Sequence, residues 1–125
     1  FMAVVLRKAY GLGALAMATG SFDETLFAIS WPTGEFAGMG LEGQIKLGRR
    51  NELAAIENIQ ERKARYEKMV DDAYAWSRAL NAGTVFEVDD VIDPADTRRW
   101  VAAGLRSAPP VIPRQGKKLN WIDTW

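Results

Sequence analysis

The chain has 125 residues, of which 48% are hydrophobic, and this size and composition favour one globular domain. Its 16 basic and 16 acidic residues cancel, so no net charge attracts nucleic acid or an acidic membrane surface. The sequence has neither cysteine nor histidine, which excludes disulfides, thiolate nucleophiles and the commonest metal ligand. We therefore expect no metal site, no membrane span and a cytoplasmic location. Any catalysis must rely on carboxylates, lysines, hydroxyls or backbone amides.

The first half of the chain alternates short apolar runs with glycine turns. Strands are predicted for the β-branched and apolar segments Ala3–Leu6, Leu26–Trp31 and Glu35–Met39. A glycine turn at Gly11–Gly13 follows the first strand and opens a short helix of strong helix formers at Ala14–Ala18. A second helix is predicted from Gly40 to about Leu47.

The longest helical signal runs from Asn51 to Leu80, with Asn51 as its N-cap. Apolar residues recur along it at steps of three and four and form one stripe: Ile56, Ile59, Tyr66, Met69, Val70, Ala73, Tyr74 and Leu80. Its length suggests two helices with a break near Asp71–Asp72, and Asn81–Gly83 is expected to end the second helix.

The last third contains an extended segment, one helix and a tail. Val85–Ile92 is predicted to be extended, and Asp93 is expected to cap a helix that runs to about Leu105, with a proline at its first position. The tail, residues 108–125, holds prolines and tryptophans and is predicted to be irregular, unlike residues 1–107. Alternating strands and helices, with one long helical segment, predict an α/β fold.

Two glycine runs, Gly11–Ala16 and Gly38–Gly43, match the fingerprint of dinucleotide-binding folds. The acidic residue that should follow about 20 positions later would be Glu35, but it lies after a turn rather than at a strand tip. A nucleotide-binding module is therefore a distant alternative, and plain turns explain the second run more simply. Consecutive amides at the first run can instead point at one oxygen and form an oxyanion hole, which needs no catalytic side chain.

Three ordered blocks carry a resemblance to a known family: VVLRKAYG at Val4–Gly11, WPTGE and MGLEG within Trp31–Gly43, and VDDVIDPADTR at Val88–Arg98. Together they resemble the carboxyltransferase subunit of biotin-dependent acyl-CoA carboxylases of the propionyl- and methylcrotonyl-CoA type. The resemblance extends from about Val4 to Arg106. It implies that residues 1–107 are the last part of the C-subdomain of a crotonase-like fold.

The resemblance also implies roles for the first glycine turn. In that family, a backbone amide pair of the C-subdomain faces the ureido carbonyl of carboxybiotin, and here the pair falls on Leu12 and Gly13. The implied biotin-binding residues are Gly11, Leu12, Gly13 and Ala14. Lys8 and Tyr10 would support the turn. Leu15 replaces an aspartate that is thought to help the family choose short acyl groups.

By resemblance, the chain is part of an acyl-CoA carboxyltransferase that moves a carboxyl group from carboxybiotin, carried on a partner protein, to an acyl-CoA. The implied partners are the N-subdomain of a carboxyltransferase, a biotin carrier protein and the acyl-CoA. Because the sequence has no counterpart of the N-subdomain, we expect the chain to be inactive alone. An apolar face that missing turns would cover predicts a homo-oligomer. The alternatives are a truncated, non-catalytic remnant that acts as an oligomeric or interaction domain, and a biotin-dependent decarboxylase.

Overall fold

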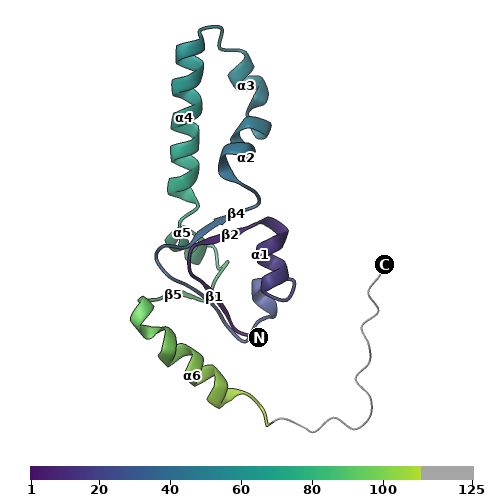
Figure 1. Ribbon diagram of the computed structural model, residues 1–125, viewed down its shortest axis with the longest axis vertical. Helices are drawn as coiled ribbons and strands as arrows, with labels where there is room; N and C mark the ends of the chain where they lie inside the picture. Colours follow the sequence, from purple (N-terminus) through teal and green to yellow (C-terminus); the bar gives the residue numbers. More distant parts are fainter. Residues whose placement is uncertain (111–125) are drawn as a thin grey trace, which may run out of the picture.

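The computed structural model describes residues 1–110, and these form a small α/β core from which a helical hairpin projects (Figure 1). The strands of the core are β1 Ala3–Val5, β2 Lys8–Tyr10, β3 Ala28–Ser30, β4 Glu35–Ala37 and β5 Asp90–Val91. Its helices are α1 Gly11–Met17, α5 Ala79–Thr84 and α6 Thr97–Ser107, with 3₁₀ turns at Phe22–Glu24 and Pro94–Asp96. The core therefore has the mixed α/β character that the sequence predicts.

The strands form two small parallel sheets, one of order β1-β3-β5 and one that pairs β2 with β4. β3 is the central strand of the larger sheet, and its residues Ile29 and Ser30 are fully buried. Successive side chains of a strand point to opposite faces. Accordingly, Ala28 packs with Phe22 on one face, whereas Ile29 packs with Phe27 on the other.

The hairpin is built from α2 Leu41–Gly48 and α3 Arg50–Ala54, which pack against the long helix α4 Ile59–Trp76 (Figure 1). Asn58 caps α4, because its Oδ1 accepts hydrogen bonds from the amides of Gln60 and Glu61 at 2.9 and 3.3 Å. The guanidinium of Arg62 donates two hydrogen bonds to the carbonyl of Ile56, at 2.9 and 2.7 Å. These contacts fix the connection between α3 and α4.

The base of the hairpin is fastened to the outer edge of β4. The Phe36 amide donates to the Ser77 carbonyl at 2.7 Å, and the Ala79 amide donates to the Gly34 carbonyl at 2.9 Å. Consequently, the end of α4 and the start of α5 lie beside the β2–β4 pair.

Helix α6 covers the face of the β1-β3-β5 sheet that carries Ile29. The Asp93 carboxylate accepts the amide of Ala95 at 2.8 Å, which confirms that Asp93 caps a helical start, although this first turn is 3₁₀. The Trp100 ring meets the Phe27 ring edge to face, with centroids 5.5 Å apart.

Several local predictions are confirmed, and others are wrong for identifiable reasons. The strands at β1, β3 and β4 and the helix at α2 lie where the sequence places them. The N-cap prediction at Asn51 is wrong, since Asn51 lies inside α3, and the predicted helical segment is interrupted at residues 55–58 and 77–78. Asp71–Asp72 lies within the continuous α4, and Asn81–Gly83 lies inside α5 rather than ending a helix.

Two further differences concern the start of the chain and its end. The sequence does not predict a strand at Lys8–Tyr10. These residues form β2 because they pair with β4, which stabilises the extended backbone. Gly11–Gly13 is the first turn of α1 rather than a separate loop before it. The predicted irregular tail lies almost wholly outside the described residues, so the division of the chain at residue 107 stays a prediction.

Candidate functional site

The glycine run after β2 forms a tight junction between strand and helix. Tyr10 is still extended, with φ −115° and ψ 126°, whereas Gly11 has a φ of +58°. This left-handed conformation is open to glycine at little cost. A Cβ atom at Gly11 would also lie 2.8 Å from the Gly38 carbonyl oxygen. Both the backbone angle and the close approach therefore require glycine at this position.

The start of α1 carries no side-chain cap among the described residues, and its first turn has no acidic residue. The first amides of any α-helix lack carbonyl partners within that helix. The amides of Leu12 and Gly13 belong to this first turn, and both residues are exposed. The helix start thus lies at the surface of the described core.

A pocket of about 460 Å³ lies beside this junction. Its walls come from α1, the 3₁₀ turn at Phe22–Glu24, the β2–β4 pair, the end of α4, and α5 with the residues that follow it. The apolar side chains that shape it are Leu12, Leu15, Phe22, Phe36, Trp76 and Val85. This size and composition are typical of pockets that bind small molecules.

The predicted site residues all lie near the junction, but only some of them line the pocket. Gly11, Leu12, Ala14 and Leu15 line the pocket, whereas Gly13 lies on the exposed side of the helix start. Lys8 and Tyr10 lie on β2 and do not line the pocket. The sequence alone does not indicate the distant walls at Phe36, Trp76 and Val85, because these belong to segments that only the fold brings together.

Tyr10 is held in place by a neighbour on β4. Its hydroxyl donates a hydrogen bond to Glu35 Oε2 at 2.7 Å, and Lys8 Nζ lies 5.7 Å from the centre of the Tyr10 ring. Burial, followed by the hydrogen bond to Glu35 and its charge, raises the pKa of Tyr10 well above its ordinary value. Tyr10, the residue before Gly11, therefore remains a protonated donor, and its hydrogen bond to Glu35 holds it in place. The sequence analysis considered Glu35 only as the acidic residue of a dinucleotide fingerprint, so it missed this contact.

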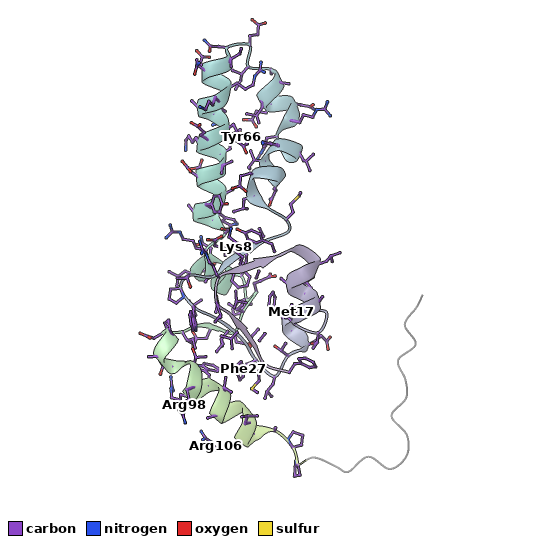
Figure 2. All side chains as sticks on the ribbon, in the orientation of Figure 1. Lys8, Met17, Phe27, Tyr66, Arg98 and Arg106 are labelled. Carbon is purple, nitrogen blue, oxygen red and sulfur yellow. The ribbon has the colours of Figure 1, made fainter. Side chains whose placement is uncertain are left out.

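A second tyrosine–glutamate pair joins the two sides of the hairpin, α2 and α4. The Tyr74 hydroxyl donates to Glu42 Oε1 at 2.7 Å, and this bond is the main cause that lowers the pKa of Glu42 and raises that of Tyr74. Nearby, Lys46 Nζ lies 5.5 Å from the centre of the Tyr66 ring. Figure 2 shows Tyr66 within the hairpin and Lys8 at its base. The polar contacts thus brace α2 and α4 above the junction.

The second glycine run has a structural use. The Gly38 carbonyl receives the close approach of Gly11, and Gly40 caps α2. Throughout residues 1–110, no group of three or more acidic, histidine or cysteine residues is arranged to hold a metal ion. In the same range, no helix combines the length and the apolar character that crossing a bilayer requires.

Comparison with known proteins identifies the protein family to which the chain belongs. The model of the carboxyl transferase domain family matches residues 1–109, so the chain belongs to this family. It is 41% identical over 103 residues to the methylmalonyl-CoA carboxyltransferase 12S subunit of Propionibacterium freudenreichii subsp. shermanii, covering 82% of this chain and 19% of that one. It is 34% identical to the propionyl-CoA carboxylase carboxyltransferase subunit of Haloferax mediterranei, and this match covers 84% of this chain and 20% of that one. The chain thus spans about a fifth of these relatives.

Solved structures agree with this assignment. The chain superposes on the transcarboxylase 12S hexamer subunit with a TM-score of 0.73 at 32% identity, covering 92% of this chain and 23% of that one. For a single-chain, multi-domain long-chain acyl-CoA carboxylase, the TM-score is 0.65 at 47% identity. This match covers 80% of this chain and 9% of that one. The fold is therefore part of a crotonase-like carboxyltransferase domain, as the sequence predicts.

Proposed function

We propose that this chain supplies the biotin side of an acyl-CoA carboxyltransferase site, with the amides of Leu12 and Gly13 facing the ureido oxygen of carboxybiotin. The observation that carries the proposal is the uncapped start of α1, fixed by the approach of Gly11 to Gly38 beside an apolar pocket. An oxygen acceptor fits this helix start, because Leu12 and Gly13 are exposed residues of the first turn and that turn has no acidic residue.

The amides act on charge that develops during the reaction. Bound carboxybiotin would supply the carboxyl group and, after releasing it, a base for the acyl-CoA. The helix start holds Leu12 and Gly13 in advance, so these amides need no rearrangement to stabilise negative charge on the ureido oxygen. Removing one such donor from a water-excluded site costs about 3–4 kcal/mol of barrier height. Tyr10, held by Glu35, keeps the junction in position.

The proposal requires other polypeptide to complete the site. The chain matches only about a fifth of the length of its relatives, and one of them is described as a hexamer with methylmalonyl-CoA bound. We propose that a carboxyltransferase N-subdomain binds the acyl-CoA, that a carrier protein presents the biotin, and that copies of this chain associate. The chain alone is then expected neither to carboxylate nor to decarboxylate an acyl-CoA.

Biotin affinity of matched Gly13 variants tests the proposal. Proline at position 13 removes the amide hydrogen and is tolerated in the first turn of a helix. Gly13→Ala keeps the amide and has open space, since no heavy atom lies within 4 Å of the new Cβ. Titration calorimetry with free biotin should show binding to the original chain and to Gly13→Ala, but at least about tenfold weaker binding to Gly13→Pro. Equal affinities of the proline and alanine variants would refute the proposal.

A further inference from the structure

We propose that residues 114–125, in the tail of this chain, bind an exposed apolar surface that flanks α5 on the same chain. We call this surface the α5 rim and define it by three side chains: Trp76, Val85 and Phe86. The contact joins two parts of one polypeptide and does not depend on biotin binding.

The α5 rim exposes much apolar surface. Trp76 is 69% exposed, Val85 is 62% exposed and Phe86 is 87% exposed. Trp76 and Val85 line the pocket beside the junction, and Phe86 lines a second, smaller pocket. Both pockets are also lined by Phe22 and Glu87, so they adjoin and the rim extends along both. Apolar side chains gathered on a surface in this way mark contact sites.

Phe86 exposes its ring from an unfavourable backbone conformation. Its φ is +60°, a left-handed value that glycine adopts readily and that a Cβ atom disfavours. The Phe86 amide donates to the Gly83 carbonyl at 3.2 Å, and the Glu87 amide donates to the Ala82 carbonyl at 3.0 Å. These bonds hold the turn at the end of α5. Residues held in such conformations cluster at functional sites, and here the residue presents an apolar ring to solvent.

A negative charge lies beside the rim. Acidic side chains line the smaller pocket: Asp23, Glu87 and Asp89. The Asp89 carboxylate accepts the amide of Ala28 at 2.7 Å, so it holds the start of β3. Glu87 is exposed and lines both pockets. A segment that covers the rim therefore meets Glu87, and a basic residue next to apolar ones suits this surface.

The tail carries side chains of this kind in the required order. Basic residues come just before large apolar residues that include two tryptophans: Arg114, Lys117 and Lys118, then Leu119, Trp121 and Trp125. A lysine can pair with Glu87 while the tryptophans cover the rim, and each tryptophan can bury about 150–250 Å². The tail thus offers both the charge and the apolar area that complement the rim.

The tail is also long enough to reach the rim. Helix α5 lies against β5, since a Cβ atom at Gly83 would lie 3.5 Å from Val91 Cγ2. From Val91 the chain reaches Thr97 in six residues, at most about 22 Å when extended. The 11 residues of α6 add about 16 Å. The 14 residues from Ser107 to Trp121 can span roughly 46–50 Å, which exceeds this path.

A spin label in the tail of the full chain tests the contact. The chain has no cysteine, so a nitroxide on the variant Thr124→Cys attaches at one position. The unpaired electron of the nitroxide weakens the amide resonances of nearby residues in a ¹H–¹⁵N spectrum. We expect the largest loss of signal within residues 1–110 at Trp76, Val85 and Phe86. If the largest loss falls instead on Ser107 and its neighbours on α6, where the tail begins, the proposal is refuted.

Matched substitutions in the spin-labelled chain identify the side chains that make the contact. Trp121→Ser should abolish the loss of signal at the rim, whereas Asn120→Ser, at the neighbouring position, should preserve it. Phe86→Gly should also abolish it, and because glycine suits the left-handed backbone, unfolding cannot explain that result. Lys118→Glu should weaken the contact, and a second substitution, Glu87→Lys, should restore it. An unchanged loss of signal in Trp121→Ser or Phe86→Gly would show that the contact is absent.

A mixed sample separates contact within the chain from contact between copies. In this sample, ¹⁵N-labelled chain without the nitroxide is combined with isotopically unlabelled chain that carries it. Because the contact lies within one chain, the amides of the rim should keep their full signal. Loss of signal at the rim would assign it to the tail of a second copy and overturn the proposal. No sample contains biotin, so each outcome is independent of the proposed role of the amides at the start of α1.

Discussion

Replacing Gly11 by alanine is the sharpest local perturbation of the junction. Gly11 has a φ of +58°, and left-handed backbone costs a residue with a Cβ about 1–2 kcal/mol. The new Cβ would also lie 2.8 Å from the Gly38 carbonyl oxygen, and relief of such crowding costs about 1–3 kcal/mol. Alanine also restricts the unfolded chain more than glycine does, and this effect stabilises the folded state by about 0.4–1 kcal/mol. We expect Gly11→Ala to lower the free energy of unfolding by about 2–3 kcal/mol.

Gly13→Ala is the matched control on the same helix. No heavy atom lies within 4 Å of its Cβ position, and its backbone is helical, so alanine should stabilise the chain by about 0.5–1 kcal/mol. Urea unfolding followed by circular dichroism at 222 nm, the usual helix band, measures both variants. If Gly11→Ala unfolds at the same urea concentration as the original chain, the strained junction described above is wrong.

Four more predictions concern Tyr10, the cap of α4 and the association of the chain. Glu35→Gln should lower the pKa of Tyr10, because it removes a negative charge beside the hydroxyl; an ultraviolet pH titration would show this, with no change for Glu24→Gln. Since the folded chain raises the pKa of Tyr10 above 10.0, stability should fall as the pH rises past about 10, and less so in Tyr10→Phe. Asn58→Ala should cost about 1 kcal/mol in urea unfolding and Asn51→Ala less than about 0.5 kcal/mol, because only Asn58 caps a helix. Light scattering should detect a homo-oligomer at tens of micromolar protein, roughly the range of ordinary affinities, and a stable monomer would contradict it.

Local patterns predicted much of the core but not its non-local pairings. Leu26–Trp31 and Gly40–Leu47 carry their own strand and helix signals, and the structure confirms both. Lys8–Tyr10 carries no such signal, because one of its three residues is charged and exposed, and pairing with β4 decides its conformation. Strand pairing between distant segments is a property of the fold, so no short window of sequence contains it.

The break in the long helical segment shows the same limit. Asn51 and Asn58 have equal intrinsic merit as N-caps. Arg62 selects between them, because its guanidinium binds the Ile56 carbonyl and favours a turn just before Asn58. The residues of the predicted apolar stripe differ in burial, since Met69 is buried in the hairpin whereas Ile59 is 73% exposed. Periodicity therefore predicted the helices but placed their boundary wrongly.

The candidate site was predictable in part for a related reason. The junction at Gly11–Gly13 is contiguous in the sequence, so its motif is visible there. The pocket is not contiguous: Phe36 comes from β4, and Trp76 comes from the end of α4. Pairing of Phe36 with Ala9 brings β4 to the junction, and the hydrogen bond from the Phe36 amide to the Ser77 carbonyl brings the end of α4 there.

The central claim is that the amides of Leu12 and Gly13 bind the ureido oxygen of biotin. Amide ¹H–¹⁵N chemical shifts of the full chain during a titration with free biotin test it most directly. Both amide protons should move to higher frequency, as hydrogen bonds to an oxygen form, and the amide resonances of Ala16 and Met17 on the same helix should move far less. The binding role of Leu12 and Gly13 would be contradicted if their two resonances stay in place while biotin binds, or if the largest shifts fall on residues away from the start of α1.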